Sequence, residues 1–218
     1  MKRPRVLLAD DHTLVVEGLK KLLEPDFELA GTVQDGFALL EAAQKLKPDA
    51  ILLDISMPLL NGIEACRRLK RSLPKAKIIM LTMHADRTYL AEAFRAGASG
   101  YLLKRSAVTE LVFAIHEVLR GRFYVTPLVA KDMVHSFLDQ SQPAHSHAPG
   151  FESPILTERQ REILQLVAEG RANKEIAVIL RIAVKTVEFH KSQIMRRLNI
   201  HTTAELTKYA VAHGIVQV

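Results

Sequence analysis

Short apolar runs recur at regular intervals through the first half of the sequence. They lie at residues 5–9, 27–33, 50–54, 77–82 and 100–104. Between these runs the apolar residues return at helical spacing instead. Alternating strands and helices predict a parallel sheet covered on both faces, because each parallel connection needs a crossover. The first half is therefore predicted to be an α/β fold, a doubly wound sheet of five parallel strands.

The second half follows a different pattern, because its apolar residues return only at helical spacing after about residue 125. Thr157 followed by Gln160, and Thr202 followed by Glu205, are capping boxes, which mark helix starts. Gly170 closes the first of these helices. Four helices joined by short connections predict a small all-α domain.

The segment between the two halves, residues 139–154, reads DQSQPAHSHAPGFESP and has almost nothing to bury. Its Ser, Pro and Gly content is typical of a flexible linker. Pro127 stands at a helix-start position, which predicts one more helix leading into the linker. We therefore expect an α/β domain over residues 1–122, a helix and linker over 123–154, and a helical domain over 155–218.

Composition and charge limit the class of protein. The chain has 218 residues, of which 48% are hydrophobic and 25% charged, as in soluble globular proteins. No apolar stretch approaches the roughly 20 residues that span a bilayer, and acids follow too soon after the start for a secretory signal. We expect a cytoplasmic protein that binds no membrane. The net charge is +6, and between Arg171 and Arg197 seven basic residues meet only two acids, so a polyanion is a plausible partner.

Polar side chains stand where four of the predicted strands end. Asp10 and Asp11 follow the first strand, Asp54 ends the third, Thr82 ends the fourth and Lys104 ends the fifth. In a doubly wound sheet, ligands collect beyond the carboxyl ends of the strands. We therefore expect these groups to face one small pocket, with Asp54 at its rim rather than buried.

Carboxylates this close repel one another unless a cation shares the site, and a hard divalent ion such as Mg²⁺ suits an oxygen shell. Asp54 could then attack a phosphoryl group and form an acyl phosphate. Lys104 could pair with the added oxygens, and the Thr82 hydroxyl could donate a hydrogen bond to one of them. Taken singly, each residue has a plainer interpretation as a helix cap or a solvated side chain.

The motifs ADD at 9–11, LLDISMPLLNG at 52–62, LT at 81–82 and GYLLK at 100–104 resemble the receiver domain of bacterial response regulators, which has a flavodoxin-like fold. This resemblance implies that Asp54 is the phosphoacceptor and that Thr82 and Lys104 sense the phosphoryl group. It implies that Mg²⁺ is held by the following ligands: Asp10, Asp11, Asp54 and the main-chain oxygen of Ser56.

Two residues at the fourth motif, GYLLK, differ in how they fit the family: Tyr101 lies within it and Arg105 directly follows it. Tyr101 matches the switch aromatic of the receiver family, and a tyrosine that merely packs in the core is the alternative. Arg105 stands where many receivers have a proline after the lysine, so the backbone of that turn is open.

The segment 185–198 is predicted to be a two-sided helix. Val187, Ile194 and Leu198 share one face. The other face carries a mixed basic, acidic and aromatic stripe of Lys185, Glu188, Phe189, Ser192 and Arg196. Such a stripe fits the major groove of double-stranded DNA. A solvated helix in an ordinary bundle is the alternative.

Residues 156–198 resemble the LuxR-type helix-turn-helix domain, and the whole chain resembles the NarL/FixJ class of response regulators. The resemblance implies that 185–198 is the recognition helix. It places Glu188, Phe189 and Ser192 toward bases, and Lys185, Thr186, Lys191 and Arg196 toward phosphates. Ala183 stands where the family usually has a serine, so one hydrogen bond, to the helix cap or to a phosphate, is expected to be missing.

Together these features predict a two-component response regulator and not an enzyme. A sensor histidine kinase would phosphorylate Asp54 and so control sequence-specific DNA binding and transcription. The protein would bind DNA as a homodimer, with residues 203–213 as the dimer contact. RNA polymerase is a candidate partner. One alternative is a DNA-binding regulator that is never phosphorylated. The other is a Mg²⁺-dependent phosphatase of the haloacid dehalogenase type, which would have an acid where Ser56 stands. The kinase, the promoters, the direction of regulation and any occlusion of the recognition helix stay open.

Overall fold

The computed structural model describes residues 3–83, 85, 87–131 and 156–216, which fall into two compact units. The first is an α/β unit that reaches residue 131, and the second is a helical unit that starts at residue 156. The predicted linker, 139–154, lies outside the described residues, as does 132–138 of the helix expected before it. Within the described ranges, no helix is both long and apolar enough to cross a membrane.

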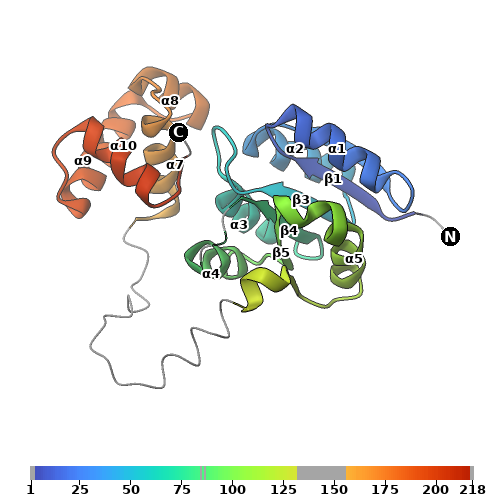
Figure 1. Cartoon of the computed structure of the whole chain (residues 1–218). Helices are drawn as coiled ribbons and strands as arrows, with labels where there is room; N and C mark the ends of the chain where they lie inside the picture. Colours follow the sequence, from blue (N-terminus) through green and yellow to red (C-terminus); the bar gives the residue numbers. More distant parts are fainter. Residues whose placement is uncertain (1–2, 84, 86, 132–155, 217–218) are drawn as a thin grey trace, which may run out of the picture. The chain divides into compact units, whose positions relative to one another are not determined.

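Strands and helices alternate along the first unit (Figure 1). Its strands are β1 (Arg5–Ala9), β2 (Glu28–Val33), β3 (Ala50–Asp54), β4 (Lys77–Thr82), β5 (Gly100–Leu103) and β6 (Tyr124–Val125). Its helices are α1 (Thr13–Leu23), α2 (Gly36–Leu46), α3 (Gly62–Ser72), α4 (Arg87–Arg95), the short 3-10 helix η1 (Lys104–Ser106) and α5 (Ala107–Leu119). Each of the five predicted strands begins and ends within one residue of its apolar run.

The six strands form one parallel sheet in the order β2-β1-β3-β4-β5-β6. Alternate residues such as Val6, Leu8 and Leu52 pack with α1 and α5 in one apolar cluster. Helix α2 contacts α3, and α3 contacts α4. Every residue of β3 is buried, as expected for a central strand with helices on both faces. The predicted doubly wound fold is confirmed.

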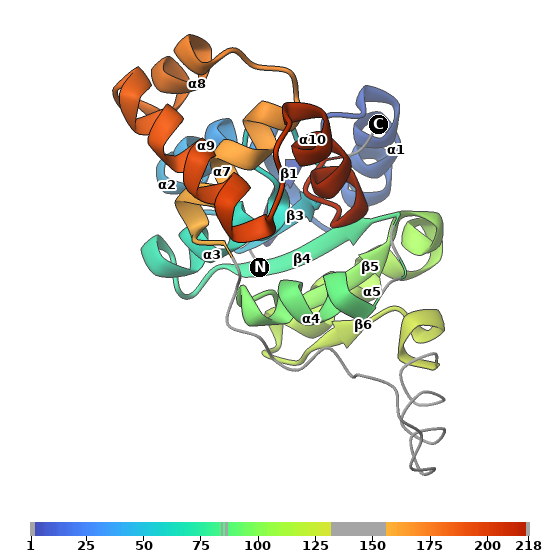
Figure 2. The ribbon, with the colours of Figure 1, turned by 90° about the vertical axis from the view of Figure 1, so that its left-hand side faces the viewer.

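The sheet has one strand more than predicted, because Tyr124–Val125 pairs in parallel with β5 (Figure 2). A strand of two residues leaves no apolar run that a sequence pattern could detect. Two residues later the chain turns into a helix at Pro127, the position predicted for a helix start, and this helix is described as far as residue 131.

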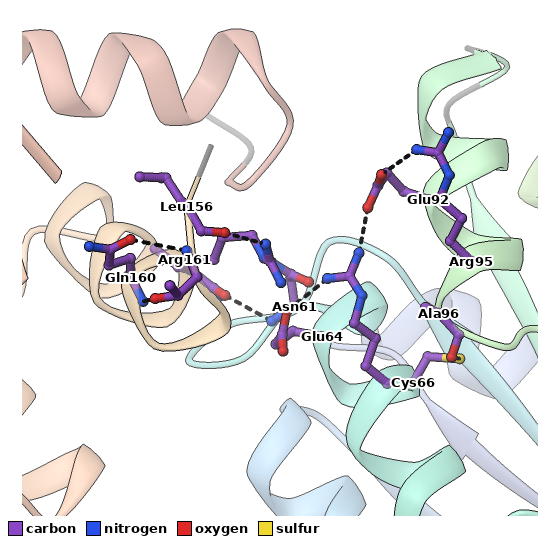
Figure 3. A network of polar contacts seen from close by, with 12 residues as sticks. Asn61, Glu64, Cys66, Glu92, Arg95, Ala96, Leu156, Gln160 and Arg161 are labelled. Carbon is purple, nitrogen blue, oxygen red and sulfur yellow. Dashed lines mark hydrogen bonds and ion pairs between the residues drawn. The ribbon is translucent and has the colours of Figure 1, made fainter. Parts of the chain in front are cut away.

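Polar contacts join the neighbouring helices α3 and α4 (Figure 3). The Arg67 guanidinium donates to the buried Glu64 on its own helix at 2.9 Å and also bonds to Glu92 on α4. Arg95 donates to the same Glu92 carboxylate at 2.9 Å. Beside them, the buried Cys66 thiol contacts the Ala96 carbonyl oxygen at 3.5 Å. The contacts of Arg67 and Cys66 therefore link the middle of α3 to the last turn of α4 and the residue after it.

The second unit consists of helices α7 (Glu158–Ala168), α8 (Asn173–Leu180), α9 (Val184–Leu198) and α10 (Thr203–Ala212). Both predicted capping boxes are present, at Thr157 and at Thr202, each with its hydroxyl accepting from the backbone three residues later. Gly170 follows α7 with φ +80°, a conformation that favours glycine, and so ends the helix as predicted. The four-helix prediction is confirmed.

Candidate functional site

The carboxyl ends of four strands bring the predicted site residues of the first unit to one edge of the sheet. Asp10 directly follows β1, Asp54 is the last residue of β3, Thr82 is the last residue of β4, and Lys104 directly follows β5. Because the strands are parallel and in register, with Asp54 opposite Leu81 and Thr82 opposite Leu103, these side chains are neighbours. The fold therefore assembles the pocket that the strand-end pattern predicted.

Lys104 joins the two inner acids of this pocket. Its Nζ atom lies 2.8 Å from Asp10 Oδ2 and 2.8 Å from Asp54 Oδ2. The lysine side chain is only 9% exposed, so both ion pairs are largely removed from solvent. Asp54 itself is 2% exposed, which corrects the expectation that it stands at an open rim. The strand delivers Asp54 to the edge of the sheet, where its carboxylate is buried in contact with the Lys104 ammonium.

Burial shapes the electrostatics of the pair. Burial raises the pKa of Asp54, and the negative charge of Asp10 raises it further. The charge and hydrogen bond of Lys104 lower it, as does a hydrogen bond from the Ser56 backbone, but these effects offset the rise only in part. Burial also lowers the pKa of Lys104, but Asp54 and Asp10 outweigh it, and the pKa of Lys104 is raised overall. The ammonium is therefore held charged, whereas the Asp54 carboxylate lacks full compensation for its own charge.

A group that could hold a metal ion surrounds this pair. Asp10, Asp11, His12 and Asp54 each offer one ligand atom, and these atoms all lie within 4.8 Å of one another. The two buried carboxylates and the exposed Asp11 make an oxygen-rich set with an opening to solvent, which suits a hard, partly hydrated divalent cation. The main-chain oxygen of Ser56, expected as a further ligand, stays a prediction.

His12 was not singled out from the sequence. Its Nδ1 atom lies 2.9 Å from Asp11 Oδ1 and 3.2 Å from Asp10 Oδ1, and its side chain is 55% exposed. Its backbone N–H also donates to Asp10 Oδ1 at 2.9 Å. Its position directly after Asp10 and Asp11 is the sequence signal that could have identified it. His12 fixes the orientation of the Asp10 carboxylate.

Gly62 is a second residue whose role the sequence did not reveal, although it ends the motif LLDISMPLLNG. A Cβ atom at this position would lie 2.0 Å from the main-chain oxygen of Asp54. The Gly62 N–H donates to the Ile55 carbonyl oxygen at 2.8 Å. Glycine therefore allows the start of α3 to pack directly against the backbone that carries Asp54.

Tyr101 and Arg105 lie on either side of Lys104 in the sequence. Tyr101 is fully buried on β5, opposite Met80 of β4. Its proposed switching stays a prediction, because an inward ring fits both a switch residue and a core residue. Arg105 lies in η1, so the turn after the lysine is a short 3-10 helix that continues into α5.

Helix α9 of the second unit carries the residues predicted to contact DNA. Val187 and Ile194 are buried, and Leu198 is partly buried, so these residues form the inner face. Lys185, Glu188, Phe189, Ser192 and Arg196 are all exposed, whereas Thr186 and Lys191 are partly buried. Phe189 is 60% exposed, which is unusual for a large apolar side chain with only a structural role. The two-sided helix is thus as predicted, beginning one residue earlier, at Val184.

The two ends of α9 differ in how they are anchored. Its N-cap residue, Ala183, makes no side-chain cap hydrogen bond, as its place in the sequence predicted. Near the other end, Arg197 donates to the Gln160 side chain of α7 at 3.1 Å. Arg197 therefore holds the C-terminal end of α9 to α7, whereas the N-terminal end lacks a side-chain cap.

Both halves of the chain match known families. Residues 6–116 match the response regulator receiver domain, and residues 154–210 match the bacterial regulatory proteins of the luxR family. The chain is 36% identical over 216 residues to the oxygen regulatory protein NreC of Staphylococcus epidermidis, covering 98% of this chain and 99% of NreC. It is 39% identical over 214 residues to the transcriptional regulatory protein MctR of Rhizobium johnstonii, covering 97% and 95%.

Solved structures give the same result over the full length. A response regulator RcsB structure from Salmonella typhimurium has a TM-score of 0.64 and 28% identity, and covers 98% of this chain and 99% of that one. A structure of two RcsB dimers bound to two parallel DNAs has a TM-score of 0.57 and 28% identity, covering 95% and 98%. The chain therefore belongs to the NarL/FixJ class of two-component response regulators, in which a receiver domain controls a LuxR-type DNA-binding domain through phosphorylation.

Proposed function

We propose that Asp54 accepts the phosphoryl group that controls this response regulator. The observation that carries the proposal is the ammonium of Lys104 placed 2.8 Å from both Asp10 and Asp54 in a buried pocket. A cation fixed at this point can stabilise the oxygens of an incoming phosphoryl group without reorganisation.

In the proposed reaction, an Asp54 carboxylate oxygen attacks the phosphorus atom of a phosphohistidine on a sensor histidine kinase. A phosphorus–oxygen bond forms while the phosphorus–nitrogen bond breaks, and the imidazole leaves with the electron pair. Asp10, Asp11 and Asp54 would hold Mg²⁺, with the main-chain oxygen of Ser56. Bound there, the ion would neutralise charge that builds up on the phosphoryl oxygens. Thr82 and Lys104 would then bind the added oxygens, and Tyr101 would follow them as the switch residue.

For the second unit we propose sequence-specific binding of double-stranded DNA by α9. Glu188, Phe189 and Ser192 would meet base edges, and the positively charged Lys185, Lys191 and Arg196, with Thr186, would meet phosphates. The exposure of this stripe supports the assignment. Two copies joined through α10 would read two half-sites, as one helix in one groove gives little affinity. RcsB on DNA is itself a dimer.

The protein acts as a transcription regulator rather than an enzyme, with RNA polymerase as a candidate partner. It works in the bacterial cytoplasm, because the DNA it would bind lies there. The regions 1–122, 123–154 and 155–218 serve as receiver, connecting segment and DNA-binding domain.

The two alternatives make different demands on the chain. A phosphatase of the haloacid dehalogenase type needs an acid two positions after the nucleophile, and Ser56 stands there. A regulator independent of phosphorylation would not need Lys104 held against Asp54 and Asp10. The assembled pocket therefore favours a phosphorylated receiver.

The test is phosphorylation by acetyl phosphate in the presence of Mg²⁺, followed by phosphate-affinity electrophoresis. Wild-type protein should be retarded and Asp54→Asn should not, while Asp26→Asn, which alters an exposed acid outside the pocket, should behave as wild type. Borohydride reduction and mass spectrometry of wild-type protein should locate the acyl phosphate at residue 54. Uptake by Asp54→Asn equal to that of wild type would refute the assignment.

A further inference from the structure

Thr126 lies at the point where the chain leaves the sixth strand. It directly follows β6 and directly precedes the helix that starts at Pro127. Its side chain is 1% exposed although it is polar. A buried hydroxyl needs a partner, and the Thr126 Oγ1 atom accepts a hydrogen bond from the Leu103 N–H at 3.1 Å. Leu103 is the last residue of β5, immediately before Lys104.

This side-chain hydrogen bond replaces a missing bond of the sheet. The Tyr124 N–H donates to Ser99 and the Thr126 N–H donates to Tyr101, the alternating pattern of a parallel pair. If the pattern continued, the Leu103 N–H would donate to the Thr126 carbonyl oxygen. That oxygen instead accepts from Val129 and Ala130, at 2.9 and 3.1 Å, because the next helix has begun. The hydroxyl thus acts as the last acceptor of the β5–β6 ladder.

The position of this bond matters because Lys104 is the next residue of the chain. The Leu103 N–H and the Tyr101 carbonyl are both held by Thr126, so the backbone on both sides of Leu102 is fixed from β6. Lys104 must place its Nζ atom 2.8 Å from both Asp10 and Asp54. A small shift of the backbone at Leu103 would displace that atom.

We propose that Thr126 is a positioning residue for Lys104, fixing the end of β5 so that the lysine meets the phosphoryl group at Asp54. The inference rests on the proposed function of Asp54. Thr126 touches neither the phosphoryl group nor the cation, and acts only through the backbone of Leu103. Thr126 also directly precedes the helix that starts at Pro127, so the end of β5 and the start of this helix share one anchor.

The chemistry of the bond defines the variants that test it. Thr126→Val keeps the shape of the side chain but removes the acceptor, and leaves the buried Leu103 N–H unpaired. Thr126→Ser keeps the hydroxyl. Thr32→Val is the matched control, since Thr32 is an exposed residue on β2, at the opposite edge of the sheet. Thermal unfolding of each full-length variant shows that it is folded before the assay.

Two measurements on the full-length protein separate positioning from general loosening. The first is the rate of phosphorylation by acetyl phosphate, which we expect Thr126→Val to lower by about five- to tenfold. The second is the affinity for Mg²⁺ alone, measured by titration calorimetry. A bound cation would compete with Lys104 for the Asp10 and Asp54 carboxylates, so a loosened lysine should leave this affinity unchanged or higher, whereas a loosened pocket should lower it.

The proposal holds if Thr126→Val is phosphorylated more slowly than wild type but binds Mg²⁺ at least as tightly, while Thr126→Ser and Thr32→Val match wild type in both measurements. It is overturned if Thr126→Val phosphorylates at the wild-type rate, if its Mg²⁺ affinity falls together with the rate, or if Thr126→Ser is as slow as Thr126→Val. A wild-type protein that takes up no phosphoryl group at residue 54 would instead refute the proposed function, and this inference with it.

Discussion

A Cβ atom on Gly62 would lie 2.0 Å from the main-chain oxygen of Asp54, a separation that real contacts do not reach. It would also lie 2.9 Å from the Asp54 carbonyl carbon and 3.0 Å from the Ile55 Cα. All three neighbours are backbone atoms, which cannot turn aside as a flexible side chain can. The absence of a side chain at residue 62 is therefore a condition for the position of Asp54.

We predict that Gly62→Ala destabilises the receiver unit by about 1–3 kcal/mol, as overpacking does, and slows phosphorylation of Asp54. Chemical denaturation and the acetyl phosphate assay measure the two effects. Gly18→Ala is the control, because Gly18 lies within α1 and a Cβ there would meet nothing within 4 Å. That variant should gain about 0.5–1 kcal/mol from its better helix propensity. Equal stability of the two variants would contradict the steric argument.

The raised pKa of Asp54 makes the stability of the metal-free receiver unit depend on pH. The native state holds the Asp54 proton to higher pH than the unfolded chain does, so stability falls as pH rises from the unfolded pKa to the native one. Above the native pKa, this loss of stability has reached its full value and no longer changes with pH. The Asp54→Asn variant has no such loss, because asparagine does not titrate.

Without Mg²⁺, we therefore expect Asp54→Asn to be more stable than wild type at pH 7.5, by about 1 kcal/mol for each unit between the two pKa values. The advantage should shrink as pH falls toward the ordinary range of an aspartate. Urea unfolding at several pH values measures it, and added Mg²⁺ should narrow the gap by binding wild type. An advantage that did not change with pH would mean that the Asp54 proton is not its source.

Cys66 is predicted to be inert in the folded protein. Burial raises the pKa of its thiol to about 12, and the side chain is fully buried. Reaction with a chromogenic disulfide at pH 8 should be slower in the native protein than in guanidinium by a factor on the order of 1000, because the thiolate is scarce and inaccessible. The chain has a single cysteine, so the signal has one source. Rapid labelling of the native protein would show that α3 opens.

The two kinds of residue on the α9 stripe should affect DNA binding differently. Lys185→Ala should weaken binding to all sequences and reduce the slope of affinity against salt by about one, because one phosphate contact is lost. Glu188→Ala should change the preferred site with a nearly unchanged salt slope. Fluorescence anisotropy with specific and random duplexes measures both. Lys45→Ala, an exposed charge on α2, controls for net charge, and binding unaltered in both α9 variants would refute the recognition-helix assignment.

Much of the fold was predictable because it depends on local patterns. The apolar runs predicted five strands, because a central parallel strand is buried on both faces and reads as a continuous apolar segment. Thr157 and Thr202 predicted two helix starts, because a capping box is completed within four residues. The strand-end rule then predicted that Asp10, Asp54 and Lys104 would meet.

The sequence by itself thus determined the order of elements, the edge of the sheet that carries the site, and the exposed stripe of α9. Only the tertiary structure decided the short strand β6, the close approach of Gly62 to Asp54, the burial of Asp54 against Lys104, and the hydroxyl of Thr126 in place of a carbonyl. Periodicity and capping follow from the sequence pattern within one element, whereas these four features depend on how separate elements approach one another in space. Such distances are set when the layers pack.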